Sequence, residues 1–233
     1  MENKELNEKL TCIWNTYQHV SPFKNEEMLK VLERNYCYAE PSQKGKTMVV
    51  GFNPSYGGND DVISYTLSSA KHRYFTTLRK TVLSDAETTY LDLFYFKYTE
   101  QSVIEKLISE EGELGLAFMV EQLELTKQIM EDSKPKLILV MNKGAWAYFG
   151  YYEKYVWMGY TFEEVSNLDI KEGKLMRITG FRDSHFRLLP KLESTNLIGT
   201  YVYFSRHLNR VPTPKKDIIT NEIKEIRKNV FKG

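Results

Sequence analysis

Polar side chains that could bind a ligand follow several predicted strands of this chain. In MVVGFNPSYGGND (48–60), an apolar run ends at Asn53-Pro54, where the proline restrains the backbone beside a polar amide. An amide oxygen can accept a hydrogen bond from a water, but an amide is a poor base and would act by positioning that water. Asp92 lies within a later predicted strand, and His207 follows another. The simpler interpretation of Asn53 is that it starts a turn, as Asn-Pro often does.

The elements that must position these residues alternate between strand and helix. Short apolar runs predict strands at 46–52, 89–96, 136–142 and 199–205, with a further candidate at 174–181. Helices are predicted at 3–19, 25–34, 70–83, 101–110, 113–133, from 144 onward, and at 218–231. This alternation indicates an α/β domain with a mainly parallel sheet. Ligands of such sheets bind at the carboxyl ends of the strands, so polar groups there should converge, namely Asn53, Asp92 to Lys97, Asn142, and Ser205 to Asn209.

Composition sets further bounds. A chain of 233 residues that is 42% hydrophobic can bury one core, which predicts a single domain. Within it we expect a helical N-terminal cap at 1–45, a core at 46–212 and a basic C-terminal helix at 213–233. The formal net charge is only +1, so no global field draws the chain to nucleic acid, although a local basic face can suffice.

Cysteine usage and the hydrophobic pattern point to a cytoplasmic protein without a metal centre. Cys12 and Cys37 belong to no metal-binding spacing and cannot supply a four-ligand cluster. The N-terminus lacks the apolar core of a signal peptide, and no stretch approaches the ~20 apolar residues of a membrane span. We therefore expect no membrane association, no metal and no cofactor, and a monomer.

Four segments resemble, in order, motifs of the uracil-DNA glycosylase superfamily. Gly-Phe-Asn-Pro (51–54) resembles the first motif, Gly-x-(Asn or Asp)-Pro at a strand end, in the Asn form of the mismatch-specific and single-strand-selective branches. HRYFTTL (72–78) resembles the Asn-Arg-Phe-Trp-x-x-Leu helix that follows it. SKPKLILVMNKGAWAYFG (133–150) is similar to the third strand and its helix, and FSRHLNR (204–210) resembles the second catalytic motif. The resemblance covers 46–212 and implies a three-layer α/β/α fold around a four-stranded, mainly parallel sheet.

The resemblance implies a DNA glycosylase, which hydrolyses the N-glycosidic bond of a damaged or mismatched base flipped out of DNA. The transition state is oxocarbenium-like. Asn53 would place a water beneath C1′, and His207 would donate to the departing base, where negative charge develops. The family has Pro-Ser after this His or Asn, whereas this chain has Leu208 and Asn209. A structural histidine is the alternative interpretation of His207.

Asp92 is the departure that bears on the choice of base. The family's second strand usually ends in an Asn whose amide accepts from uracil N3–H and donates to O4. An ionised carboxylate only accepts. It would suit two adjacent donors, such as N1–H and the exocyclic amine of guanine, whereas a protonated Asp92 would regain a donor. Alternatively, the alignment slips by a residue or two, or Asp92 is a buried structural acid.

Further candidates surround these three residues. The expected base-binding set is Phe52, Tyr56, Tyr65, Asp92, Ser205 and Asn209, in which Tyr56 or Tyr65 stacks on the base or simply packs. Asn142 is either a residue of the site or a helix cap. Phosphates would contact Lys71, Arg73, Arg206 and Arg210. Residues 206–233 contain eight Lys or Arg and only three acidic residues. This excess of positive charge predicts either a DNA-contacting tail or a solvated helix face.

Two other functions compete with a glycosylase. A relative with the same fold could bind a nucleotide or nucleic acid without catalysis, as the departures at Asp92 and His207 suggest. An unrelated α/β hydrolase could use Asp183, Ser184 and His185, although no Gly-x-Ser-x-Gly elbow accompanies them.

Overall fold

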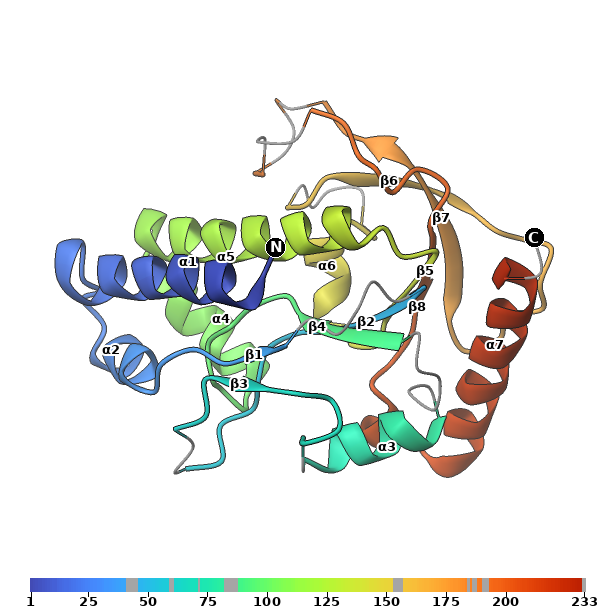
Figure 1. Cartoon of the computed structure of the whole chain (residues 1–233), viewed down its shortest axis with the longest axis horizontal. Coiled ribbons are helices and arrows are strands. Elements are labelled where there is room, and N and C mark those ends of the chain that lie inside the picture. The colour runs from blue at the N-terminus through green and yellow to red at the C-terminus, as the bar shows by residue number, and fades with distance from the viewer. Residues whose placement is uncertain are drawn as a thin grey trace.

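A six-stranded sheet in the order β4-β2-β5-β8-β7-β6 organises the chain (Figure 1). In this computed structural model the described residues are 1–40, 46–58, 61–70, 72–81, 88–152, 157–183, 185, 188–189 and 193–231. The four parallel strands are β2 (Thr47–Gly51), β4 (Thr88–Asp92), β5 (Leu137–Val140) and β8 (Tyr201–Phe204). β2, β4 and β5 are buried throughout, as expected of parallel strands covered on both faces.

An antiparallel hairpin extends the sheet beyond the predicted four strands. β7 (Lys174–Phe181) runs antiparallel to β8, and β6 (Tyr160–Glu164) runs antiparallel to β7. The predicted strand at 174–181 therefore exists, but the four-stranded layout is not confirmed, because β7 and the unpredicted β6 bring the sheet to six strands. β6 lies at the edge of the sheet and ends in exposed glutamates, so it lacks the apolar run that marks the central strands.

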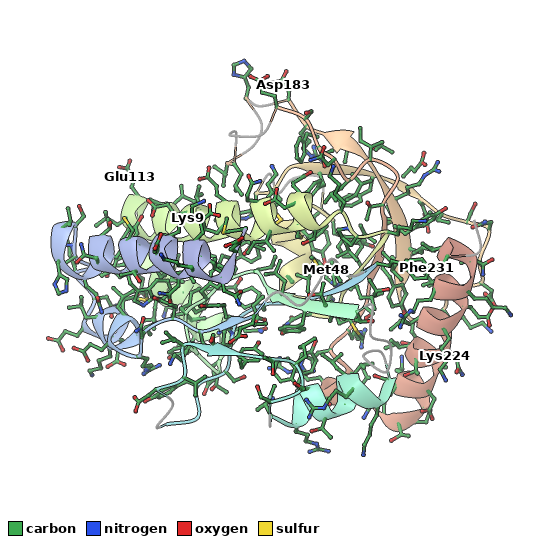
Figure 2. The ribbon with its side chains drawn as sticks, viewed as in Figure 1. Lys9, Met48, Glu113, Asp183, Lys224 and Phe231 are labelled. Carbon is green, nitrogen blue, oxygen red and sulfur yellow. The ribbon has the colours of Figure 1, made fainter. Side chains whose placement is uncertain are left out.

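Helices cover both faces of the sheet, giving three layers (Figure 1). One core joins Met48 and Val50 of β2 to α1 (Asn3–Asn15), α2 (Glu26–Glu33), α4 (Gln101–Glu110), α5 (Glu113–Ser133) and α6 (Ala145–Phe149). The opposite core joins Val49 of β2 to α3 (Arg73–Thr81) and α7 (Thr213–Phe231). Successive strand residues thus point to opposite layers. Figure 2 shows Met48 between the sheet and the helices above it.

Several boundaries differ from the predicted ones for local reasons. α4 and α5 have the predicted bounds, whereas the predicted strand at 89–96 ends at Asp92 and continues as irregular chain. α7 begins at Thr213 rather than 218. Pro214 lies in its first turn, where the missing N–H of proline costs no hydrogen bond within the helix. The predicted first helix consists of α1 followed by a π-helical turn, η1 (Thr16–Val20). Separately, β1 (Tyr38–Ala39) and β3 (Ser64–Tyr65) form a short parallel pair.

Within the described ranges, none of the helices combines the length and apolar character needed to cross a membrane.

Candidate functional site

A cleft of about 940 Å³ opens at the carboxyl ends of the four parallel strands. Residues 51–56 continue from β2, Asp92 ends β4, Asn142 follows β5, and His207 follows β8. The wall opposite them comes from β3, α3 and the chain that precedes α3. The polar residues that follow four separate strands therefore meet at one cavity, which is large enough for a nucleotide-sized ligand.

The amide of Asn53 has a fixed orientation. Its Nδ2 lies 2.9 Å from the carbonyl oxygen of Pro54, 3.2 Å from that of Phe96 and 2.7 Å from that of Tyr98. A flipped amide would place Oδ1 against the same three acceptors, so the NH₂ group must face them. Oδ1 has no hydrogen bond to any described residue, and Asn53 lines the cleft half-buried. The structure thus leaves this oxygen free to accept a hydrogen bond from a water.

Asp92 is a buried carboxyl held by two phenols. Its Oδ1 accepts from the Tyr90 hydroxyl at 2.7 Å and its Oδ2 from the Tyr65 hydroxyl at 3.3 Å. Burial, only partly offset by these two hydrogen bonds, raises the pKa of Asp92 to about 7. Burial and the nearby Asp92 also raise the pKa values of Tyr65, Tyr74 and Tyr90, so all three phenols stay protonated. Asp92 therefore accepts hydrogen bonds from two phenols, and its oxygens can accept further hydrogen bonds.

His207 is a neutral imidazole in a defined tautomer. Its Nδ1 accepts from the backbone N–H of Asn209 at 3.2 Å, at the start of a short 3₁₀ turn, η3 (Leu208–Arg210). Burial, and then the charge of Arg210 and the nearby His72, lowers the pKa of His207 to about 4. A neutral ring whose Nδ1 accepts carries its proton on Nε2. The ring stacks on Tyr74 with centroids 4.3 Å apart, which leaves Nε2–H as a positioned donor.

We expect Asp92→Asn to change how stability depends on pH. The raised pKa of Asp92 favours the protonated folded state, so ionisation removes stability as the pH rises from about 4 to about 7. His207 acts oppositely, because its lowered pKa removes stability as the pH falls from about 6.5 to about 4. Urea unfolding between about pH 5 and about pH 8 measures this. The wild-type free energy of unfolding, relative to the variant, should decline with pH, and a constant difference would contradict the assignment.

The other predicted base-binding residues are divided between the cleft and the core. Phe52, Tyr56, Tyr65 and Asn209 line the cleft, whereas Ser205 does not. Ser205 is fully buried at the end of β8, where its carbonyl accepts from the indole of Trp146 at 3.3 Å.

These lining residues also have structural contacts. Tyr56 donates to the Gly58 carbonyl at 2.8 Å, and Asn209 Oδ1 accepts from the Thr77 hydroxyl at 2.8 Å. Asn142 lines the cleft and also accepts from the Gly144 backbone N–H at 2.9 Å, so it stabilises the turn into α6.

The predicted phosphate contacts lie on two neighbouring elements. Arg73 on α3, Arg206 before η3 and Arg210 at the end of η3 are exposed, and the Thr77–Asn209 hydrogen bond joins these elements. Arg210 also lines the cleft, whereas Lys71 lies outside the described residues.

The basic tail is partly neutralised. Lys215 pairs with the partly buried Glu172 at 3.0 Å, and Lys228 pairs with Glu225 at 3.9 Å on the surface. These pairs favour a solvated helix face for much of α7.

Three residues in or beside the site were not predicted to belong to it. Tyr90 could have been found, because residues two apart in a strand share a face and it precedes Asp92 by two. Tyr74 was assigned only to the apolar stripe of its helix, yet its hydroxyl is buried without a hydrogen-bond partner in the described part of the chain. The Arg34 guanidinium lies 4.4 Å from the centre of the ring of Tyr56, which lines the cleft.

The hydrolase hypothesis receives no support from the placement of Asp183. Asp183 and His185 are exposed, and the Asp183 carboxylate accepts from the His185 backbone N–H at 3.0 Å rather than from its imidazole. Ser184 lies outside the described residues. Figure 2 shows Asp183 on a loop at the edge of the molecule away from α3. Among the described side chains, no three His, Cys, Asp or Glu residues lie close enough to hold a metal ion.

No protein-family model matches the chain, and a comparison with curated proteins found no significant match.

Proposed function

We propose that the chain is a DNA glycosylase-like hydrolase that cleaves the N-glycosidic bond of a base flipped out of DNA. The observation that carries this proposal is the oriented Asn53 amide of the cleft lining, whose NH₂ group contacts three backbone carbonyls while Oδ1 has no hydrogen bond to a described residue. An oxygen held in this way can position a water for attack at C1′, as in the family that residues 46–212 resemble.

His207 supplies the second function that the reaction needs. As the bond breaks, negative charge develops on the departing base, and a donor fixed in the same cleft stabilises it. The neutral ring can donate through Nε2–H because its Nδ1 is already bound to the Asn209 N–H. Arg73, Arg206 and Arg210 would contact the phosphates on either side of the flipped nucleotide.

The test is an excision assay on oligonucleotides that each carry uracil, hypoxanthine, xanthine, mismatched thymine or an oxidised guanine, scored for abasic sites. We expect product from at least one base and a loss of about 100-fold in rate for Asn53→Ala, as for other removed positioning groups. Asn229→Ala is the matched control, because this exposed asparagine of α7 lies outside the cleft.

The competing function is a nucleotide- or nucleic-acid-binding relative without catalysis. One observation favours it: the Asn53 contacts tie the turn after β2 to the chain after β4, a structural role that needs no chemistry. Measurable DNA binding without abasic product from any oligonucleotide would establish this alternative over hydrolysis.

A further inference from the structure

The end of the cleft at Asp92 presents hydrogen-bond acceptors, whereas the family that the chain resembles has an amide at this position. A carboxylate offers four lone-pair positions, and each oxygen of Asp92 uses one for a phenol. One acceptor position therefore remains on each oxygen. In the described part of the chain, neither an ammonium nor a guanidinium group pairs with Asp92, so these positions stay available to a ligand.

The same end of the cleft also contains an unused donor. The Tyr74 side chain is only 6% exposed and lines the cleft, yet its hydroxyl has no hydrogen-bond partner among the described residues. Its ring is held between the His207 imidazole and Tyr90, with centroids 4.3 and 6.1 Å away. A buried hydroxyl without an acceptor costs free energy, and a ligand oxygen would remove that cost.

The geometry points to a guanine-type base as the ligand, with Asp92 and Tyr74 as specificity-determining residues. The Watson–Crick edge of guanine presents two adjacent donors, the N2 amine and N1–H, followed by the acceptor O6. Asp92 matches the two donors through its two oxygens, and the Tyr74 hydroxyl matches O6. Uracil presents an acceptor on each side of a single N3–H, which would place a carbonyl oxygen against the carboxylate.

The inference deepens the proposed function by naming its substrate class. A substrate must keep N1–H and the N2 amine, so its damage would lie elsewhere, on the imidazole ring of guanine. Damaged or mismatched bases leave the stack at the lowest cost, which adds selectivity over normal guanine. The binding preference itself does not require catalysis, so it can be tested separately.

The experiment measures binding of dGMP, dIMP and dUMP by isothermal titration calorimetry at about pH 8, where Asp92 is ionised. dIMP differs from dGMP only by the missing N2 amine. We expect dGMP to bind about tenfold or more tightly than either competitor, the size expected for one hydrogen bond to a charged group. Asp92→Asn should reverse the order in favour of dUMP, because an amide both accepts and donates.

Two further variants separate specificity from folding. Tyr74→Phe removes only the hydroxyl and should weaken dGMP binding without reversing the order. Glu105→Gln is the matched control, because this half-buried acid accepts from the Tyr148 phenol at 2.6 Å but does not line the cleft. Thermal unfolding of each variant shows whether it is folded. If Asp92→Asn does not fold, Tyr74→Phe still tests the inference.

The outcomes distinguish this inference from the proposed function. Equal binding of dGMP and dUMP, no nucleotide binding, or an unchanged order in Asp92→Asn would overturn the guanine assignment. Abasic product from uracil together with any of these results would leave the hydrolase intact. If the wild type gives no abasic product from any oligonucleotide and the dGMP preference persists in Asn53→Ala, the results would support this inference and refute hydrolysis.

Discussion

Gly51→Ala is expected to lower the free energy of unfolding by about 3 kcal/mol, the upper end of the usual cost of overpacking a core. A Cβ at Gly51 would lie 2.0 Å from the Tyr90 hydroxyl oxygen and 2.2 Å from Asp92 Oδ1. Gly51 pairs with Asp92 in the sheet, and both side chains that it would meet are buried. Because these groups also line the cleft, the substitution should weaken ligand binding as well.

The matched control for this prediction is Gly57→Ala, on the loop that follows. A Cβ at Gly57 meets nothing within 4 Å, so urea unfolding should give nearly the wild-type stability. In a Tyr90→Phe background Gly51→Ala should cost less, because the closer of the two contacts is gone. Equal stabilities for the Gly51 and Gly57 variants would show that Tyr90 and Asp92 do not pack against β2 as described.

The position of the site was predictable because parallel strands leave a strong pattern. Strands buried on both faces are apolar along their whole length, and the polar residue that ends each run marks the carboxyl edge of the sheet. Asn53 could be selected on that basis, whereas Asp92 lies inside the predicted strand at 89–96 and was selected through the family resemblance. β6 was missed because an exposed edge strand needs no apolar run.

The chemistry within the site was less predictable because it depends on contacts between distant segments. The orientation of the Asn53 amide is set by carbonyls 43 and 45 residues away, at Phe96 and Tyr98. The Tyr65 phenol reaches Asp92 from 27 residues away, and α3 lies between them in the sequence. Sequence periodicity describes one element at a time, so it predicted which residues lie at the edge but not their hydrogen-bond partners.

The Asn53 geometry leads to an expectation opposite to the one that the family resemblance suggests. In that family aspartate at this position is expected to give faster hydrolysis than asparagine. Here Asn53→Asp would place a carboxylate oxygen against three backbone carbonyls that now accept from Nδ2 at 2.7 to 3.2 Å. We expect a loss of about 2 to 4 kcal/mol in the free energy of unfolding, because acceptors would face acceptors without a shared hydrogen.

The order of stability and its pH dependence make this prediction specific. At about pH 8 the wild type should be the most stable, Asn53→Ala intermediate and Asn53→Asp the least stable, since alanine removes the donor without adding a charge. The carbonyls would raise the pKa of the new carboxyl in the folded state, so the Asn53→Asp variant should regain stability as the pH falls. Urea unfolding at several pH values measures both effects. An Asn53→Asp variant as stable as the wild type, or faster in excision, would mean that the asparagine NH₂ group does not face these carbonyls. The water-positioning role would then lose its structural basis, because that role depends on Oδ1 being the atom left at the cleft.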